Sequence, residues 1–443
     1  MAAATQERWT ILAGIPKVVK DEEAKRIFPP GTSISVAYNE LPSASVLTAP
    51  FRITSPPYPY GNYPYIAAAD PSGLLLLSAK HPLAEFSAMI TYHICDARTG
   101  EVISLCNHRG PMDLHADNVG LIMSGQRCLV AELLPKSDGT GRATLLCYTV
   151  GEYQWVEMEL DYSPPLQQGR FWYGDGVISH AGLLWWVDLS YGLLACDPFA
   201  DEPELIHTPF PRVLDELPVE RMNRSAYCCV KVSGGRLRYV QIHGSPDAPV
   251  VSMWTLADPP ASAGEWIPEC SVCLADIWAD ESYLETMLPR SVPALALLHP
   301  ADPCKVYFFL GSCIFAVDLR RRMIVEFSEF EMPNPPDQMM TSSLFVHAWQ
   351  YDPSRSRPSD FVPTHLRKVK EIAAQRRLFA GMYNSYLRRR GTAAKLNGSR
   401  KSVSRRIQKV MRMITPDHVF KRRGISKVDL HRFASLTMDE MGS

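Results

Sequence analysis

Clusters of short apolar segments recur along this chain, and their recurrence limits the possible folds more than any other feature. The clusters occupy residues 72–106, 118–162, 176–210, 226–274 and 294–330. Each of the last four contains four strand-like segments, and the first contains at least three, with glycine-containing turn signals between them. Four-stranded units that repeat every ~40–50 residues are typical of a β-propeller, in which each unit forms one blade.

The remaining strand-like segments lie at the two ends of this region. Residues 9–14, 33–38 and 51–55 precede the clusters, and residues 343–351 follow them. We expect these segments to combine into a closing blade, because joining the two ends removes free sheet edges that would otherwise favour aggregation. The sequence therefore predicts an all-β fold, a β-propeller with six blades, with seven blades as the alternative.

One strand-like segment, residues 183–189, contains two adjacent tryptophans, Trp185 and Trp186. Adjacent residues of a strand point to opposite faces, and this segment is apolar without alternation, as expected when both faces are covered. We therefore expect Trp185 to face one neighbouring blade and Trp186 to face the other, rather than to form a binding platform. By the same argument, Cys228 and Cys229 point to opposite faces and serve packing.

The charge changes sign along the chain, although the formal net charge is only -1. Residues 361–443 contain 20 Lys and Arg against 5 Asp and Glu, a net charge of +15, which leaves -16 on residues 1–360. All nine Trp and all 11 Cys lie in the acidic part. These shifts predict three parts, which are a β-propeller domain at 1–352, a linker at 353–363 and a basic α-helical tail at 364–443.

The tail contains two amphipathic segments with clusters of basic residues around them. Apolar residues recur at steps of three and four in residues 364–390, and more briefly in residues 404–414, which predicts α-helices. Such clusters are typical of nuclear import signals, of contacts with nucleic-acid backbones or anionic membranes, or of a helix docked on the acidic body of the same chain. The residues expected to make these contacts are Arg388, Arg389, Arg390, Arg400, Lys401, Arg405, Arg406, Lys421, Arg422 and Arg423.

A series of segments in a fixed order carries a family resemblance, strongest from about Gly120 to Trp349. It includes VISHAGLLWWVDLSYGLLACDPFADEPELIHTPFP, VKVSGGRLRYVQI, LALLHPADPCKVYFFLG and SSLFVHAW. In these segments the chain resembles the plant domain-of-unknown-function family sixteen-eighteen, which is expanded in grasses. The resemblance implies a plant origin, a propeller-like fold similar to the domains that accompany F-box adaptors, and no known catalysis. The chain shows no F-box helix set at its start.

Two further groups of side chains have the composition of a metal site. Cys270 and Cys273 have zinc-knuckle spacing, but a structural zinc site normally has four ligands, and buried strand thiols are the favoured interpretation. Residues 197–205 contain four carboxylates, but calcium needs six or more oxygens in a defined geometry. A solvated acidic turn is therefore favoured there, and we expect no metal and no cofactor.

The loop at residues 106–118 gathers the best candidates for catalysis. His108, Asp113, His115 and Asp117 could exchange protons or bind a metal. No hydrolase, nucleotide-binding or metalloprotease motif lies in a fitting strand–helix context, which favours a protein that is not an enzyme. A propeller hydrolase or lyase that uses His108, Asp113 and His115 is the alternative.

The leading hypothesis is a non-enzymatic propeller scaffold that recruits a protein partner, with a basic tail for nuclear import or acidic partners. A nucleic-acid-associated protein that contacts the backbone through its tail is a further alternative. No apolar segment approaches the ~18 residues of a membrane span, and the N-terminus has no signal-peptide pattern. We therefore expect a protein of the nucleus or cytoplasm that is not secreted.

Overall fold

The computed structural model shows an all-β fold over most of the first 351 residues. The chain divides into two compact units, Met1–Gln375 and Arg376–Ser443, and every described residue lies in the first. The predicted linker and the predicted basic tail lie outside the described residues, so the three domain boundaries stay predictions. The described residues are 9–54, 63–84, 87–105, 118–152, 154–211, 221–257, 264–330 and 342–351.

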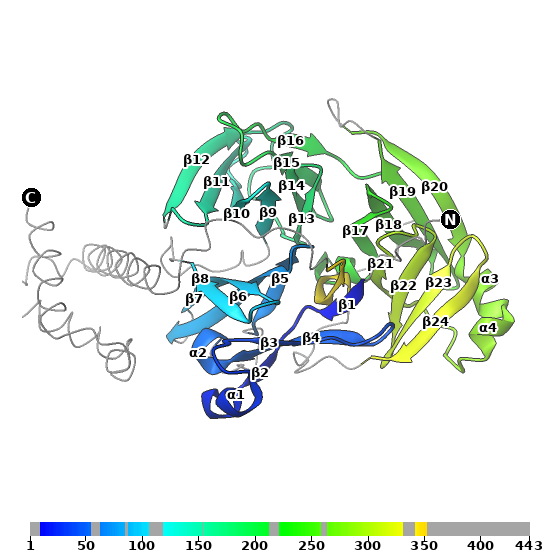
Figure 1. Cartoon of the computed structure of the whole chain (residues 1–443). Coiled ribbons are helices and arrows are strands. Elements are labelled where there is room, and N and C mark those ends of the chain that lie inside the picture. Colours follow the sequence, from blue (N-terminus) through cyan, green and yellow to red (C-terminus); the bar gives the residue numbers. More distant parts are fainter. Residues whose placement is uncertain are drawn as a thin grey trace, which may run out of the picture. The chain divides into compact units, whose positions relative to one another are not determined.

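Five four-stranded antiparallel sheets form the blades, and each is built from four consecutive strands (Figure 1). The strand order in each sheet follows the chain, so the first and fourth strands are its two edges. The first two blades are β5 (Tyr65–Ala69), β6 (Leu74–Ala84), β7 (Ser87–Asp96) and β8 (Glu101–Ser104), then β9 (Val119–Ser124), β10 (Arg127–Pro135), β11 (Arg142–Thr149) and β12 (Trp155–Asp161).

The other three blades have the same order. They are β13 (Val177–His180), β14 (Leu183–Asp188), β15 (Gly192–Cys196) and β16 (Ile206–Thr208), then β17 (Cys228–Ser233), β18 (Arg236–Ser245), β19 (Ala248–Leu256) and β20 (Trp266–Cys273), then β21 (Ala294–Leu298), β22 (Lys305–Leu310), β23 (Cys313–Asp318) and β24 (Met323–Glu329). First strands contact one another in succession, β5 with β9, β9 with β13, β13 with β17 and β17 with β21. The first strand is therefore the inner strand of each blade, and the domain is a β-propeller.

The adjacent tryptophans confirm that the inner hairpin of the third blade is covered on both faces. Trp186 is completely buried and packs against Ile122 and Leu129 of the preceding blade. Trp185 is almost completely buried and packs against Val230 and Tyr239 of the following blade. Each indole also donates a hydrogen bond, Trp185 Nε1 to the carbonyl oxygen of residue 180 at 3.2 Å and Trp186 Nε1 to that of residue 118 at 2.9 Å. Both side chains serve packing between blades, as predicted.

The sixth sheet is not a regular blade, and the prediction of six or seven blades is wrong. It combines strands from both ends of the described region, and β1 pairs antiparallel with β25 but parallel with β4. β2 is also parallel to β4. Because parallel neighbours need a crossover connection, this sheet cannot be an up-and-down blade. The propeller has five blades, and a five-stranded mixed sheet completes it: β1 (Thr10–Ala13), β2 (Lys17–Val19), β3 (Ser35–Ala37), β4 (Ala44–Pro50) and β25 (Val346–Trp349).

In the segment predicted as a strand at residues 51–55, the described residues 51–54 form a helical turn instead. α2 (Phe51–Thr54) follows β4 directly and buries Ile53 and Thr54. The backbone N–H of Arg52 donates to Asp21 Oδ1 at 3.2 Å, in the first turn of α1 (Asp21–Ile27). A short apolar segment does not by itself distinguish a strand from a turn of helix, and here the tertiary contact decides.

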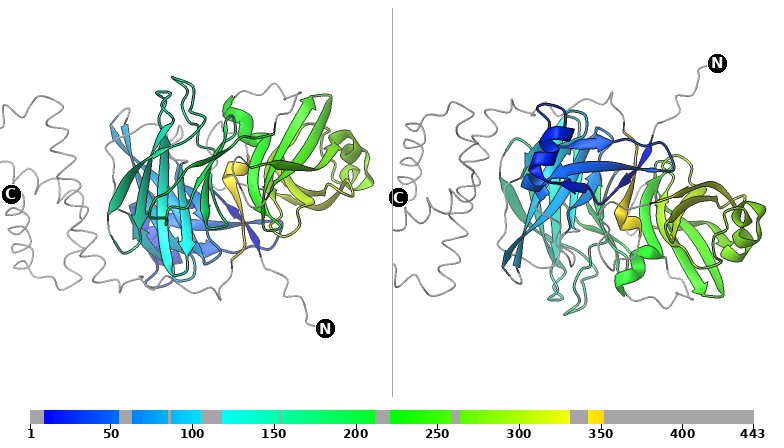
Figure 2. Two further views of the ribbon diagram at one scale, coloured as in Figure 1. Left: turned by 90° about the horizontal axis from the view of Figure 1, so that it is seen from above. Right: turned by 90° about the horizontal axis from the view of Figure 1, so that it is seen from below.

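The remaining helical elements lie in connections between strands. α3 (Leu274–Ala279) and α4 (Glu281–Leu284) connect β20 to β21. The 3₁₀ turns η1 (Arg221–Ala226) and η2 (Ser343–Phe345) contact each other and β21, and η1 also contacts β17 (Figure 2). Across the described residues, no helix combines the length and the apolarity that a membrane crossing requires.

Candidate functional site

The structure describes only some of the site residues predicted from the sequence. The ten basic residues of the tail lie outside the described residues, and so do His108, Asp113, His115 and Asp117. Partner binding by the tail and proton transfer by the loop therefore stay predictions.

The cysteine pair and the acidic turn are both described. Cys270 and Cys273 lie on β20, and burial raises the pKa of Cys270 to about 11, which keeps this thiol protonated at neutral pH. In the acidic turn, Asp197 Oδ1 accepts a hydrogen bond from the backbone N–H of Phe199 at 2.8 Å, which stabilises the turn after β15. Over the part of the chain that the structure describes, no group of three or more His, Cys, Asp or Glu is placed to hold a metal ion.

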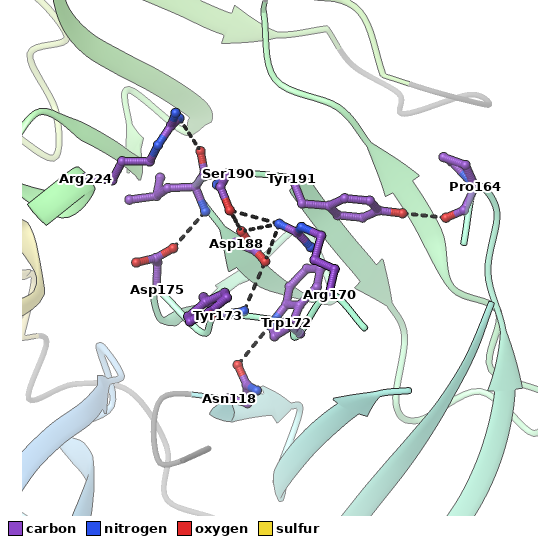
Figure 3. A network of polar contacts seen from close by, with 11 residues as sticks. Asn118, Pro164, Arg170, Trp172, Tyr173, Asp175, Asp188, Ser190, Tyr191 and Arg224 are labelled. Atoms are coloured by element: carbon purple, nitrogen blue, oxygen red, sulfur yellow. Dashed lines mark hydrogen bonds and ion pairs between the residues drawn. The ribbon is translucent and has the colours of Figure 1, made fainter. Parts of the chain in front are cut away.

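A segment that the sequence analysis did not single out carries the candidate site. Residues 163–173, here called the aromatic arm, lie in the connection between the outer strand β12 and the inner strand β13 of the next blade. The side chains at the end of the arm alternate between covered and exposed positions. Arg170 and Trp172 are largely covered, whereas Phe171 and Tyr173 are 55% and 45% exposed. Figure 3 shows the polar contacts that hold this arm on the third blade.

An ion pair is the main contact of the arm. Arg170 Nη2 lies 3.1 Å from Asp188 Oδ1 and 3.0 Å from Asp188 Oδ2, and it also donates to Ser190 Oγ at 2.9 Å. Asp188 is the last residue of β14 and is completely buried, whereas the guanidinium side chain keeps 16% of its surface. A buried carboxylate is stable only when it is paired and hydrogen-bonded, so the position of Arg170 is tightly restricted.

Asp188 also accepts hydrogen bonds from the arm and from the hairpin that follows β14. The backbone N–H of Tyr173 donates to Oδ2 at 3.0 Å. The backbone N–H and the hydroxyl of Ser190 donate to Oδ1 at 2.9 Å and 2.6 Å. One carboxylate thus fixes both ends of the segment from Arg170 to Tyr173.

Trp172 fixes the middle of that segment from the opposite direction. Its ring is almost completely buried among the second and third blades. Its Nε1 donates to Asn118 Oδ1 at 3.1 Å, and the backbone carbonyl of Asn118 accepts from Trp186 Nε1. Asn118, the residue immediately before β9, thus holds one tryptophan of the arm and one of the inner hairpin.

Tyr191 forms a platform under the arm. The Arg170 guanidinium carbon lies 4.9 Å from the centre of the Tyr191 ring, a cation–π geometry, and the Trp172 ring meets the same ring edge-on at 5.8 Å. The Tyr191 hydroxyl donates to the carbonyl oxygen of Pro164 at the other end of the arm. Burial raises the pKa of Tyr191 to about 12, so this hydroxyl remains a donor at neutral pH.

The same hairpin is connected to the fourth blade. Asp175 Oδ2 accepts from the backbone N–H of Leu189 at 2.8 Å, and Arg224 Nη1 of η1 donates to the backbone carbonyl of Leu189 at 3.3 Å. The arm therefore contacts the third blade and Asn118 beside the second blade, whereas the hairpin under the arm makes the contact with η1 before the fourth blade. Because its charged groups are paired, the arrangement favours the rigid presentation of Phe171 and Tyr173 over proton transfer.

The sequence signal for this site is short. Residues 170–173 are Arg-Phe-Trp-Tyr, so Phe171 and Tyr173 alternate along the chain with Arg170 and Trp172. This alternation is the pattern of an extended segment with one buried and one exposed face. Only the structure shows which face is covered, because the covering residues Asp188 and Asn118 are distant in the sequence.

The fold and the arm together define a β-propeller with a rigidly held aromatic surface. Residues 186–307 match the model of a family described as a protein of unknown function, DUF1618. The resemblance inferred from the sequence is thereby confirmed over this segment, which runs from the end of β14 to β22. The search of curated proteins gave no match.

Several solved structures are similar to this chain at low identity. A chain of the mitotic checkpoint complex is 13% identical with a TM-score of 0.30, over 60% of this chain and 63% of that chain, less than two thirds of its length. AztD from Citrobacter koseri is 10% identical with a TM-score of 0.32, over 75% of this chain and 84% of that chain. The Cps50 (Swd1) β-propeller domain of Myceliophteria thermophila is 10% identical with a TM-score of 0.29, over 60% and 84%. Such scores support no transfer of function.

Proposed function

We propose that this protein is a non-enzymatic β-propeller scaffold that binds a protein partner through the exposed face of the aromatic arm. The observation that carries the proposal is the alternation in residues 170–173, in which the exposed Phe171 and Tyr173 each follow an anchored side chain, Arg170 or Trp172. Large aromatic side chains that are already ordered lose little conformational entropy on binding, and such residues dominate binding energy at protein interfaces.

The composition of the arm indicates the chemistry of the partner surface. Its exposed residues are uncharged, and the charge of Arg170 is paired with Asp188. We therefore expect the partner to offer apolar and uncharged polar groups, and we expect the complex to change little with ionic strength. The exposed residues of the arm are Ser163, Pro164, Pro165, Gln167, Gln168, Gly169, Phe171 and Tyr173.

A paired variant tests this proposal. The full chain and its Phe171→Ala/Tyr173→Ala variant are used to capture proteins from extract at low salt and again at high salt. Met287→Ala is the matched control, because Met287 is an 88% exposed apolar residue after α4, away from the arm. The proposal requires a protein that the wild type and the Met287→Ala variant capture at both salt concentrations and that the double variant loses. Equal capture by all three proteins contradicts it.

For the basic tail, we propose a separate role in nuclear import or in binding acidic partners. The support is the net charge of +15 in residues 361–443. Replacement of Arg388–Arg390 and Lys421–Arg423 by alanine in the full chain should move a tagged protein from the nucleus to the cytoplasm, if the tail binds an import receptor. An unchanged distribution, together with unchanged binding to acidic partners at low salt, contradicts this role.

A further inference from the structure

A lysine occupies an inner strand near the centre of the propeller. Lys231 lies on β17, which otherwise consists of Cys, Val and Ser. Its Nζ donates a hydrogen bond to the backbone carbonyl of Ser343 in η2 at 3.0 Å. The residue as a whole is half-buried.

The charge of Lys231 is not compensated by any described residue. An ammonium group has three N–H donors, and the carbonyl of Ser343 accepts one hydrogen bond. The ion pairs found among the described residues involve other cations. Because burial disfavours an unpaired charge, it lowers the pKa of Lys231.

Two described titratable groups interact electrostatically with Lys231, Cys229 and His347, and burial keeps both of them neutral at pH 7. His347 of β25 donates through Nε2 to the carbonyl oxygen of Ile66 at 2.7 Å. Burial, with the positive charge of Lys231 as the second cause, lowers the pKa of His347 to about 4, so this imidazole is neutral at pH 7. None of these groups supplies a negative charge.

From this arrangement we propose that Lys231 forms the charged end of a binding site for a small oxyanion at the centre of the propeller. A carboxylate or a phosphate would accept hydrogen bonds from the remaining N–H groups of the ammonium and balance its charge. The inner strands β17 and β25 and the turn η2 would provide the walls, since they supply Lys231, His347 and Ser343. This site is independent of the aromatic arm and does not rest on the protein-binding role.

Protection from chemical labelling tests the site directly. The full chain is treated with an amine-acetylating reagent in chloride, acetate or inorganic phosphate at equal ionic strength, and acetylation of Lys231 is followed by peptide mass spectrometry. At an anion concentration about ten times the dissociation constant, mass action predicts that labelling of Lys231 slows roughly tenfold relative to chloride. Protection by phosphate alone identifies a phosphate site, and protection by acetate as well identifies a site for carboxylates.

A stability measurement with variants distinguishes phosphate binding at Lys231 from phosphate binding by the basic tail. Phosphate should raise the melting temperature of the wild type more than that of Lys231→Met, which removes the charge but keeps the aliphatic chain. Lys136→Met is the control, since Lys136 forms an ion pair with Glu159 outside the site, and it should keep the full phosphate effect. An equal phosphate effect in all three proteins overturns the proposal. The proposal is also overturned if no anion slows the labelling of Lys231, or if Lys231 is not labelled even in chloride.

Discussion

Arg170 Nη2 lies 3.0 Å from Asp188 Oδ2, and this ion pair joins the aromatic arm to the inner hairpin of the third blade. Asp188 is completely buried, and its carboxylate also accepts from the backbone N–H groups of Tyr173 and Ser190. The pair therefore decides both the stability of this blade and the position of the aromatic residues on the arm.

Asp188→Asn should lower the free energy of unfolding by about 3–5 kcal/mol, because the largely covered Arg170 loses its partner charge. Urea unfolding followed by circular dichroism measures the change. Asp201→Asn, in the exposed acidic turn, is the control and should change stability by less than about 0.5 kcal/mol. Adding Arg170→Met to Asp188→Asn should recover part of the loss, because it removes the unpaired guanidinium. A single variant as stable as the wild type would show that the pair does not hold the arm.

Trp186→Phe should lower the free energy of unfolding by about 2 kcal/mol. The smaller ring leaves space between the second and third blades, and the hydrogen bond to the carbonyl of Asn118 is lost. Trp155→Phe, a partly exposed residue of β12, is the comparison and should cost less. If the two variants unfold at the same urea concentration, burial between blades is not what stabilises Trp186.

Gly120→Ala should destabilise the contact between the inner strands β9 and β13. A Cβ atom at Gly120 would lie 2.5 Å from Val177 Cγ1 and 3.0 Å from Leu184 Cδ2, closer than packed carbon atoms allow. Relief of that overlap should cost about 1–3 kcal/mol. Ser124→Ala, at the exposed end of the same strand, provides the control in thermal unfolding. Equal melting temperatures for the two variants would contradict the close approach of these strands.

His347 should make the propeller less stable in mild acid. Its pKa is about 4 in the folded protein and about 6.5 in an unfolded chain, so the unfolded state binds more protons between these values. Stability contributed by the neutral imidazole is present above pH 6.5 and is lost as the pH falls towards 4, by up to about 3 kcal/mol.

His347→Gln keeps a donor for the carbonyl of Ile66 but does not titrate. Urea unfolding at several pH values between 4 and 7 should therefore show a flatter dependence in this variant than in the wild type. Some dependence should remain, because burial also lowers the pKa values of His207 and His299. Parallel curves for the two proteins would mean that His347 already binds its proton above pH 6.

Much of the fold could be read from periodicity and turns. The segments that became β14 and β15 are apolar on both faces, which predicts coverage from two sides, and Trp185 and Trp186 pack accordingly. β2, β4 and β5 were not among the predicted strands, and residues 51–54 form α2 instead of a strand. Short segments of this kind carry too few residues for a period to decide between strand and helix.

The candidate site depends on contacts that no local pattern contains. Arg170 meets Asp188 across the β13–β14 hairpin, Trp172 meets Asn118 from the preceding blade, and Lys231 meets Ser343 across more than a hundred residues. An isolated arginine, tryptophan or lysine in a sequence is compatible with many environments. Its role depends on what the fold places beside it.

The sequence by itself determined the all-β class, the repeated four-stranded blades and the joining of the two ends, because hydrophobic periodicity and turn residues act locally on the backbone. The tertiary structure decided the blade number. The parallel pairing of β4 with β1 and β2 gives a mixed sheet where a sixth blade was expected, and strand direction is set by crossover connections rather than by residue pattern. It also decided which aromatic residues are exposed and which charges are paired, since both depend on neighbours brought together only by the closed ring of sheets.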